Sequence, residues 1–125
     1  MPTDLRKALE FLEYVRYMTI AVVQPDGRPW AVPVRIQKRD DLSFYWDSST
    51  CALHSQCIAI ESRIMVMMYQ LKSEAHPEFG FYGDAIAEVV EALPDGRARY
   101  RATVTCAWMN DERHQKRKLN LPHQL

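Results

Sequence analysis

The sequence predicts a mainly β protein of the α+β class, built as a six-stranded antiparallel barrel with two helices. Short runs of β-branched and aromatic residues recur along the chain, and turn sequences such as Pro25-Asp26-Gly27 and Pro94-Asp95-Gly96 join them. Only two stretches show helical spacing, one at the N-terminus and one between the third and fourth predicted strands. Many short strands with few helices are typical of sandwiches and barrels.

The N-terminal segment predicts an amphipathic helix that ends near Arg16. Its apolar positions recur every three to four residues and form one stripe: Leu5, Ala8, Leu9, Leu12 and Val15.

Six later segments predict the strands: Tyr17–Val23, Trp30–Ile36, Leu42–Trp46, Arg63–Tyr69, Phe79–Ala92 and Arg99–Trp108. Pro33 cannot donate a ladder hydrogen bond, so its position lies at a sheet edge, at a bulge or beside a ligand. Gly83 indicates a bulge or a close backbone approach within one continuous long strand. The segment 38–41 predicts a charged turn, and the basic C-terminal tail predicts a solvated segment.

The stretch from Phe44 to Tyr69 carries the strongest functional pattern. It predicts a strand, a polar turn at Asp47–Thr50, a helix over Cys51–Ile60 with Leu53, Cys57 and Ile60 on one face, and a buried strand. His54 and Ser55 lie one turn inside this helix. Free N–H groups and the positive end of the helix dipole favour an anion at such a place.

These residues resemble a known family. Trp46-Asp47-Ser48, the run from Ala52 to Ile58, and Arg63 before an apolar strand are similar to the pyridoxamine 5′-phosphate oxidase-like proteins, which are FMN-binding split β-barrels. The segment Asp26–Val34 resembles the first hairpin of that family, and the likeness covers about residues 5 to 110. The resemblance implies a single FMN-binding split-barrel domain over residues 1–125, with FMN as the cofactor.

The resemblance also implies a set of cofactor-binding residues. Ser48, His54 and Ser55 would hold the FMN phosphate and converge near the start of the helix, while Arg35 or Arg63 would add positive charge. Many relatives carry Lys or Arg where this chain has His54. The isoalloxazine ring would lie against main-chain groups of the second strand and near an aromatic ring of the third, which places Ala31, Val32, Pro33, Val34 and Trp46 in the site. Catalytic residues are not identified by the pattern.

Composition narrows the choice of partners. The chain has 125 residues, 16 basic and 16 acidic side chains and a formal net charge of zero, so nucleic acid and anionic membrane surfaces are not predicted as partners. No apolar run approaches the roughly 20 residues that a spanning helix needs. Three cysteines without framework spacing predict reduced thiols in a cytoplasmic protein. The expected partners are a second copy of the chain, with the cofactor at the subunit interface, and a small-molecule substrate.

Several alternatives stay open. The run Cys51, His54, Cys57 does not match an established zinc spacing, so no metal site is predicted. The basic run from Arg113 to Lys118 differs from the C-terminal motif of the true vitamin B6 oxidase, so that activity is not implied. The resemblance is consistent with a flavin-dependent oxidoreductase, with a non-catalytic module that holds flavin, deazaflavin or haem, or with a cofactor-free structural dimer.

Overall fold

The computed structural model describes residues 3–122, which form two helices and eight strands. The helices are α1 (Thr3–Leu12) and α2 (Leu53–Ile60), and the strands are β1 (Tyr17–Val23), β2 (Pro29–Arg35), β3 (Lys38–Asp40), β4 (Ser43–Ser49), β5 (Arg63–Gln70), β6 (Phe79–Leu93), β7 (Arg97–Asn110) and β8 (Arg117–Lys118). All six predicted strands are present. The expected count of six is nevertheless wrong, because β3 replaces the predicted charged turn and β8 forms within the predicted solvated tail.

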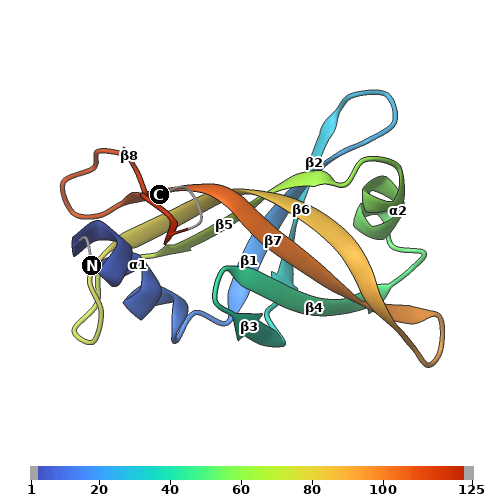
Figure 1. Cartoon of the computed structure of the whole chain (residues 1–125), viewed down its shortest axis with the longest axis horizontal. Helices are drawn as coiled ribbons and strands as arrows, with labels where there is room; N and C mark the ends of the chain where they lie inside the picture. The colour runs from blue at the N-terminus through green and yellow to red at the C-terminus, as the bar shows by residue number, and fades with distance from the viewer. Residues whose placement is uncertain (1–2, 123–125) are drawn as a thin grey trace.

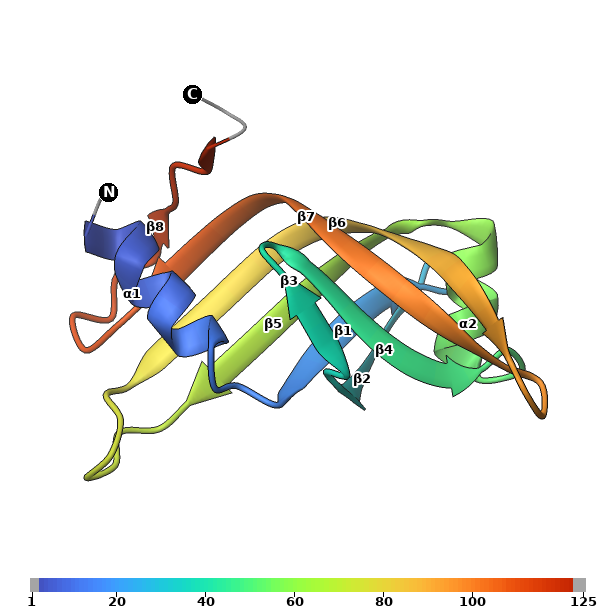
Figure 2. The ribbon, with the colours of Figure 1, turned by 60° about the horizontal axis from the view of Figure 1, so that its bottom comes forward.

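All eight strands belong to one antiparallel sheet with the order β2-β1-β5-β6-β7-β4-β3, and β8 pairs with β7 beside this path. The sheet curls strongly along its length (Figures 1 and 2). The strands β2 and β3 end the order and are not paired with each other within residues 3–122, so the sheet is not closed. Pro33 lies on β2 and therefore on an end strand, one of the three positions that its missing N–H permits.

The long strand β6 confirms the prediction of one continuous strand with a distortion near Gly83. Its pairing with β7 shifts register between Asp84 and Ala85, directly after the glycine, and again between Val89 and Glu91. A Cβ atom on Gly83 would lie 3.1 Å from the Val104 side chain. The glycine therefore permits a close approach of two neighbouring strands at the bend.

The core lies inside the curl of the sheet. Alternate residues of β1, β4, β5 and β7 point inward, as the period of two along a strand requires. The bulkiest fully buried side chains come from different strands and fill this interior: Met18, Ile20, Phe44, Trp46, Met68, Phe81 and Met109.

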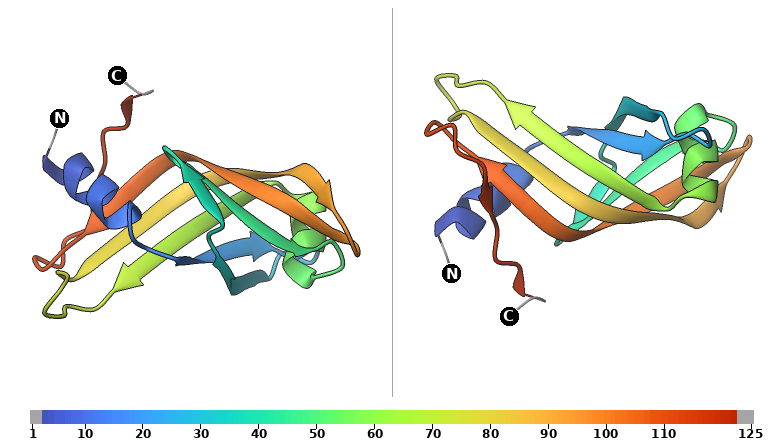
Figure 3. Two further views of the ribbon diagram at one scale, coloured as in Figure 1. Left: turned by 90° about the horizontal axis from the view of Figure 1, so that it is seen from below. Right: turned by 90° about the horizontal axis from the view of Figure 1, so that it is seen from above.

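The two helices lie at opposite ends of the sheet in both views of Figure 3. The helix α1 lies beside the C-terminal segment, and an ion pair joins Asp4 to Arg117 at 2.9 Å. It ends at Leu12 rather than near Arg16, and the N–H groups of Tyr14 and Val15 both donate to the Phe11 carbonyl in a closing turn. Neither helix within residues 3–122 has the length and apolar character to cross a membrane.

Candidate functional site

The helix α2 buries two polar side chains beside two apolar ones. Its buried residues are His54, Ser55, Cys57 and Ile58. Leu53 is 40% exposed and Ile60 is 72% exposed, so the predicted apolar face of Leu53, Cys57 and Ile60 is wrong for two of its three members. The buried face of α2 thus mixes two apolar residues, Cys57 and Ile58, with a histidine and a serine, which are residue types that are less often buried. The orientation of α2 therefore indicates that the polar face has a role beyond packing.

The helix also begins later than expected. Asp47 to Ser49 continue β4 and pair with β7, so they are not a turn. Thr50 is held by Gly96, whose carbonyl accepts from both the backbone N–H and the side-chain hydroxyl of Thr50. With Thr50 held by these two hydrogen bonds, the helix begins only at Leu53, and the end of β4 lies beneath its first turn.

Ser48 and His54 meet at this junction. A hydrogen bond of 2.8 Å joins the Ser48 Oγ and the His54 Nε2. Ser48 lies on the same face of β4 as the buried Trp46, two residues earlier, so its side chain leans toward the interior below α2. Burial lowers the pKa of His54 from its ordinary value, and the imidazole is therefore neutral at neutral pH in the ligand-free protein.

Ser55 contributes a buried hydroxyl without a partner. The residue is 3% exposed, and within residues 3–122 its Oγ has no hydrogen-bond partner. The N-cap of α2 is Ala52, which has no side-chain oxygen to accept from the first-turn N–H groups. The first turn of α2 thus combines a serine–histidine pair, an unsatisfied hydroxyl and main-chain donors, and such a set of donors fits the oxygen atoms of an anion.

Two of the three arginines on the strands around the junction are paired with carboxylates. Arg63 is not free to assist, because Glu61 binds its guanidinium at 2.7 Å. Arg99 forms a two-bond pair with Asp47. Arg97 is opposite Ser49 in the β4–β7 register, is exposed and has no ion-pair partner within residues 3–122. Sequence reasoning missed Arg97, since only the pairing of two distant strands brings it to the end of β4.

The predicted contact segment on β2 divides into two faces. Ala31, Pro33 and Arg35 are exposed, whereas Val32 and Val34 are half-buried and pack against the core. Because β2 ends the strand order, one of its edges carries main-chain groups without a strand partner in the described part of the chain. The helix α2 packs against β1 and β2, so this edge and the α2 junction belong to the same end of the molecule.

Trp46 lies away from any surface. Its side chain is fully buried and stacks on Tyr100 with ring centroids 5.5 Å apart. Its position in the core does not fit the predicted contact with a cofactor ring, because the side chain points to the inner face of β4.

The cysteine–histidine run does not converge either. Cys51 is exposed and Cys57 is buried. Among residues 3–122, no three His, Cys, Asp or Glu side chains lie close enough to hold a metal ion.

Comparisons with known proteins address the fold. No protein-family model and no curated protein sequence matches the chain. Solved structures do match. A haem-binding protein from Mycobacterium smegmatis superposes with a TM-score of 0.82 at 14% identity, over 96% of this chain and 59% of that one. A Clostridium acetobutylicum protein related to general stress protein 26, described as of the pyridoxinephosphate oxidase family, gives 0.75 at 11% identity, over 97% and 96%.

A FAD-binding protein from Mesorhizobium loti gives a TM-score of 0.72 at 14% identity, over 88% of this chain and 95% of that one. The chain has the fold of these proteins. At such identities the likeness concerns the fold alone, and it includes one FAD-binding protein and one haem-binding protein. The chain spans about three fifths of the length of the mycobacterial haem-binding protein.

Proposed function

We propose that this protein binds FMN, with the phosphate at the α2 junction and the ring system along β2. The observation that carries the proposal is the Ser48–His54 hydrogen bond beside the unpartnered Ser55 hydroxyl, at a helix start that has no side-chain cap. The fold, shared with a FAD-binding protein and with a member of the pyridoxinephosphate oxidase family, supports a flavin as the ligand.

The phosphate would be held by hydroxyl, imidazole and main-chain donors. Ser48 and Ser55 each supply one O–H, and His54 supplies a ring N–H. A phosphate monoester carries close to two negative charges at neutral pH, so its approach raises the pKa of His54 from the lowered value of the ligand-free protein. Arg97 adds a long-range positive charge from the neighbouring strand.

The ring system would be held mainly by backbone. The free edge of β2 offers main-chain groups over Ala31 to Val34, where Pro33 supplies a C=O but no N–H, and the exposed side chains of Ala31 and Pro33 are small and apolar. Arg35 adds a cation at the end of the same strand. Small side chains on a strand allow a flat ring to approach the backbone closely.

A second copy of the chain would complete the site. The outer face of the sheet continues from β2 across β1 to β5 through direct pairing, with Pro33 beside Thr19 and Thr19 beside Met67. Met67 is 38% exposed, and Ile86 on the next strand is 42% exposed. An apolar outer face of this kind is typical of an interface between subunits. We therefore propose a homodimer with the flavin between the two sheets.

When bound, the flavin supplies electron or hydride transfer, and the chain supplies binding and orientation. A flavin-dependent oxidoreductase acting on a small molecule is the activity that this arrangement supports best. The chain's own contribution lies in holding the phosphate and in excluding water between the two subunits.

FMN titration tests this proposal directly. We expect the wild-type protein to quench flavin fluorescence on binding, and His54→Ala to weaken binding by about ten- to a hundredfold because a charge-assisted hydrogen bond is lost. Ser62→Ala is the control, since Ser62 is exposed just beyond α2.

His54→Gln separates the charge of the imidazole from its hydrogen bond. The wild-type affinity should fall as pH rises, because His54 must be protonated to bind the phosphate as a cation and burial already lowers its pKa, whereas the Gln variant should show no such fall. One outcome would replace flavin by haem in this proposal. In that outcome the wild-type protein does not bind FMN but binds haemin with a Soret band, and His54→Ala abolishes the band.

A further inference from the structure

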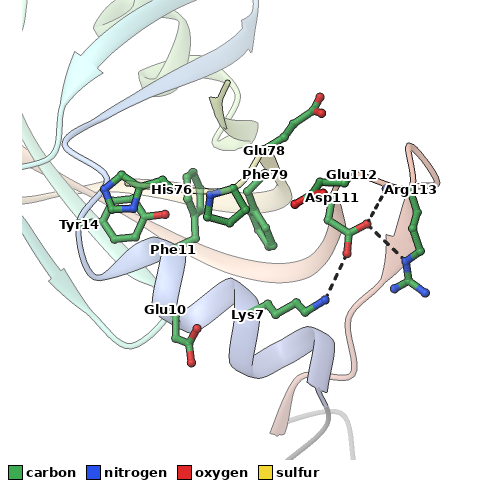
Figure 4. Close-up of a pocket in the computed structure, with 11 residues that line it drawn as sticks. Lys7, Glu10, Phe11, Tyr14, His76, Glu78, Phe79, Asp111, Glu112 and Arg113 are labelled. Atoms are coloured by element: carbon green, nitrogen blue, oxygen red, sulfur yellow. Dashed lines mark hydrogen bonds and ion pairs between the residues drawn. The ribbon is translucent and has the colours of Figure 1, made fainter. Parts of the chain in front are cut away.

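A second candidate site lies at the opposite end of the molecule from α2. A cavity of about 610 Å³ opens between α1, the loop from β5 to β6, and the end of β7 (Figure 4). Its volume falls within the range of small-molecule binding pockets. The proposed flavin site shares none of its residues with this cavity.

One wall of the cavity is aromatic. Figure 4 shows Tyr14, His76, Phe11 and Phe79 following one another along it. The rings of Phe11 and Phe79 lie 4.9 Å apart, and the His76 imidazole stacks on Tyr14 at 4.0 Å. Gln70 fixes this wall, because its amide donates to the Tyr14 hydroxyl at 2.8 Å. Phe11 and Phe79 are 2% and 3% exposed, so the Tyr14–His76 pair carries the accessible part of this wall, and the two buried rings support it from behind.

The two cations of the lining, Lys7 and Arg113, both pair with a lining carboxylate, Asp111. Lys7 and Arg113 each lie 3.5 Å from a carboxylate oxygen of Asp111 (Figure 4). Arg117 binds the same carboxylate at 3.1 Å, and these cations hold the pKa of Asp111 far below its usual range, against the effect of burial. An anionic ligand would have to displace Asp111 from these partners.

The lining carries more carboxylates than cations, with Glu10, Glu78, Asp111 and Glu112 against Lys7 and Arg113. Glu10 and Glu112 are exposed, and neither has an ion-pair partner within residues 3–122. Glu78 accepts a hydrogen bond from the Tyr69 hydroxyl and lies 3.8 Å from the His114 imidazole. The cavity thus presents flat aromatic surface together with surplus negative charge.

We propose that this cavity binds a small organic cation that joins an ammonium group to a flat apolar group. The aromatic wall buries the apolar part and attracts the ammonium through the negative faces of its rings. The three glutamates complete the electrostatic match and disfavour anions of the same shape.

Three probes of one shape and different charge test the proposal: phenethylamine, 2-phenylethanol and 3-phenylpropionate. Binding is followed by calorimetry and by chemical shifts of Tyr14 and His76. We expect phenethylamine to bind with a Kd of about 1 mM or tighter and at least about tenfold more tightly than 3-phenylpropionate. Raised salt should weaken the amine alone.

A double variant, Glu10→Gln with Glu112→Gln, should reduce the preference for the amine about threefold to tenfold. Its control is Glu74→Gln, an exposed glutamate of the β5–β6 loop outside the cavity lining. Both sets of substitutions are at exposed positions, so the fold is retained. Equal binding of the three probes, tighter binding of the carboxylate, or no binding of any probe at about 10 mM would overturn the proposal. FMN binding plays no part in these outcomes.

Discussion

Removing the Ser55 hydroxyl should stabilise the ligand-free protein and weaken its binding of FMN. An unpaired buried hydroxyl costs about 1–3 kcal/mol of desolvation, and Ser55 is 3% exposed with no partner for its Oγ within residues 3–122. Alanine is also the better helix former, by about 0.5 kcal/mol. The small gap left by one oxygen atom offsets part of this gain. We therefore expect Ser55→Ala to raise the free energy of unfolding by about 1–2 kcal/mol.

Urea denaturation with and without saturating FMN measures both effects. The variant should unfold at higher urea without FMN, and FMN should add less stability to the variant than to the wild type, because one phosphate donor is missing. Ser62→Ala, an exposed serine next to the same helix, should stay within about 0.5 kcal/mol of the wild type. Loss of stability in Ser55→Ala would refute the reasoning about its hydroxyl, and equal stabilisation by FMN would remove Ser55 from the phosphate site.

Three further substitutions test the fold and the proposed interface. Arg117→Met should lower the free energy of unfolding by about 1–2 kcal/mol at neutral pH, since Arg117 binds Asp4 and Asp111 and lowers the pKa of both carboxyl groups. The stabilisation by these ion pairs is present above the carboxyl pKa of the unfolded chain and is lost as pH falls below about 4. The denaturation midpoints of variant and wild type should therefore converge in acid. A difference between the midpoints that stays constant with pH would contradict this. Gly83→Ala should lower the melting temperature, because its Cβ would lie 3.1 Å from Val104, and an unchanged melting temperature would show that the strands can separate. Ile86→Asp should convert the proposed dimer to a monomer in light scattering without unfolding it, because Ile86 is 42% exposed in the single chain, and a dimer that persists would place the interface elsewhere.

The sequence predicted those strands whose bounds follow from a pattern of β-branched and apolar side chains. β1 matches its predicted bounds, and β6 was expected as one strand with its distortion next to Gly83. The short strands β3 and β8 were not predictable, because three and two mainly charged residues carry no period and become strands only by pairing with β4 and β7. The strand order of the sheet was not predictable for a related reason: which strands end a sheet depends on long-range pairing.

The candidate site was predictable only in part. Ser48 and His54 are close in sequence, and their contact follows from a strand that leads into a helix. The orientation of α2 was not predictable, because its apolar spacing favours Leu53 and Ile60 inward, whereas the packing of α2 on β1 and β2 turns His54 inward. Arg97 and the cavity beside α1 depend on segments far apart in sequence, and no local pattern marks them.

The most direct test of the central claim compares FMN with riboflavin, which lacks the phosphate, on wild-type protein and on His54→Ala. If the α2 junction holds the phosphate, the wild type binds FMN more tightly than riboflavin, and His54→Ala loses about ten- to a hundredfold in affinity for FMN while its affinity for riboflavin is unchanged. Ser48→Ala should show the same selective loss, because Ser48 holds the imidazole at 2.8 Å. Equal losses for both flavins, or equal affinity of the wild type for both, would contradict the assignment of a phosphate site to Ser48, His54 and Ser55.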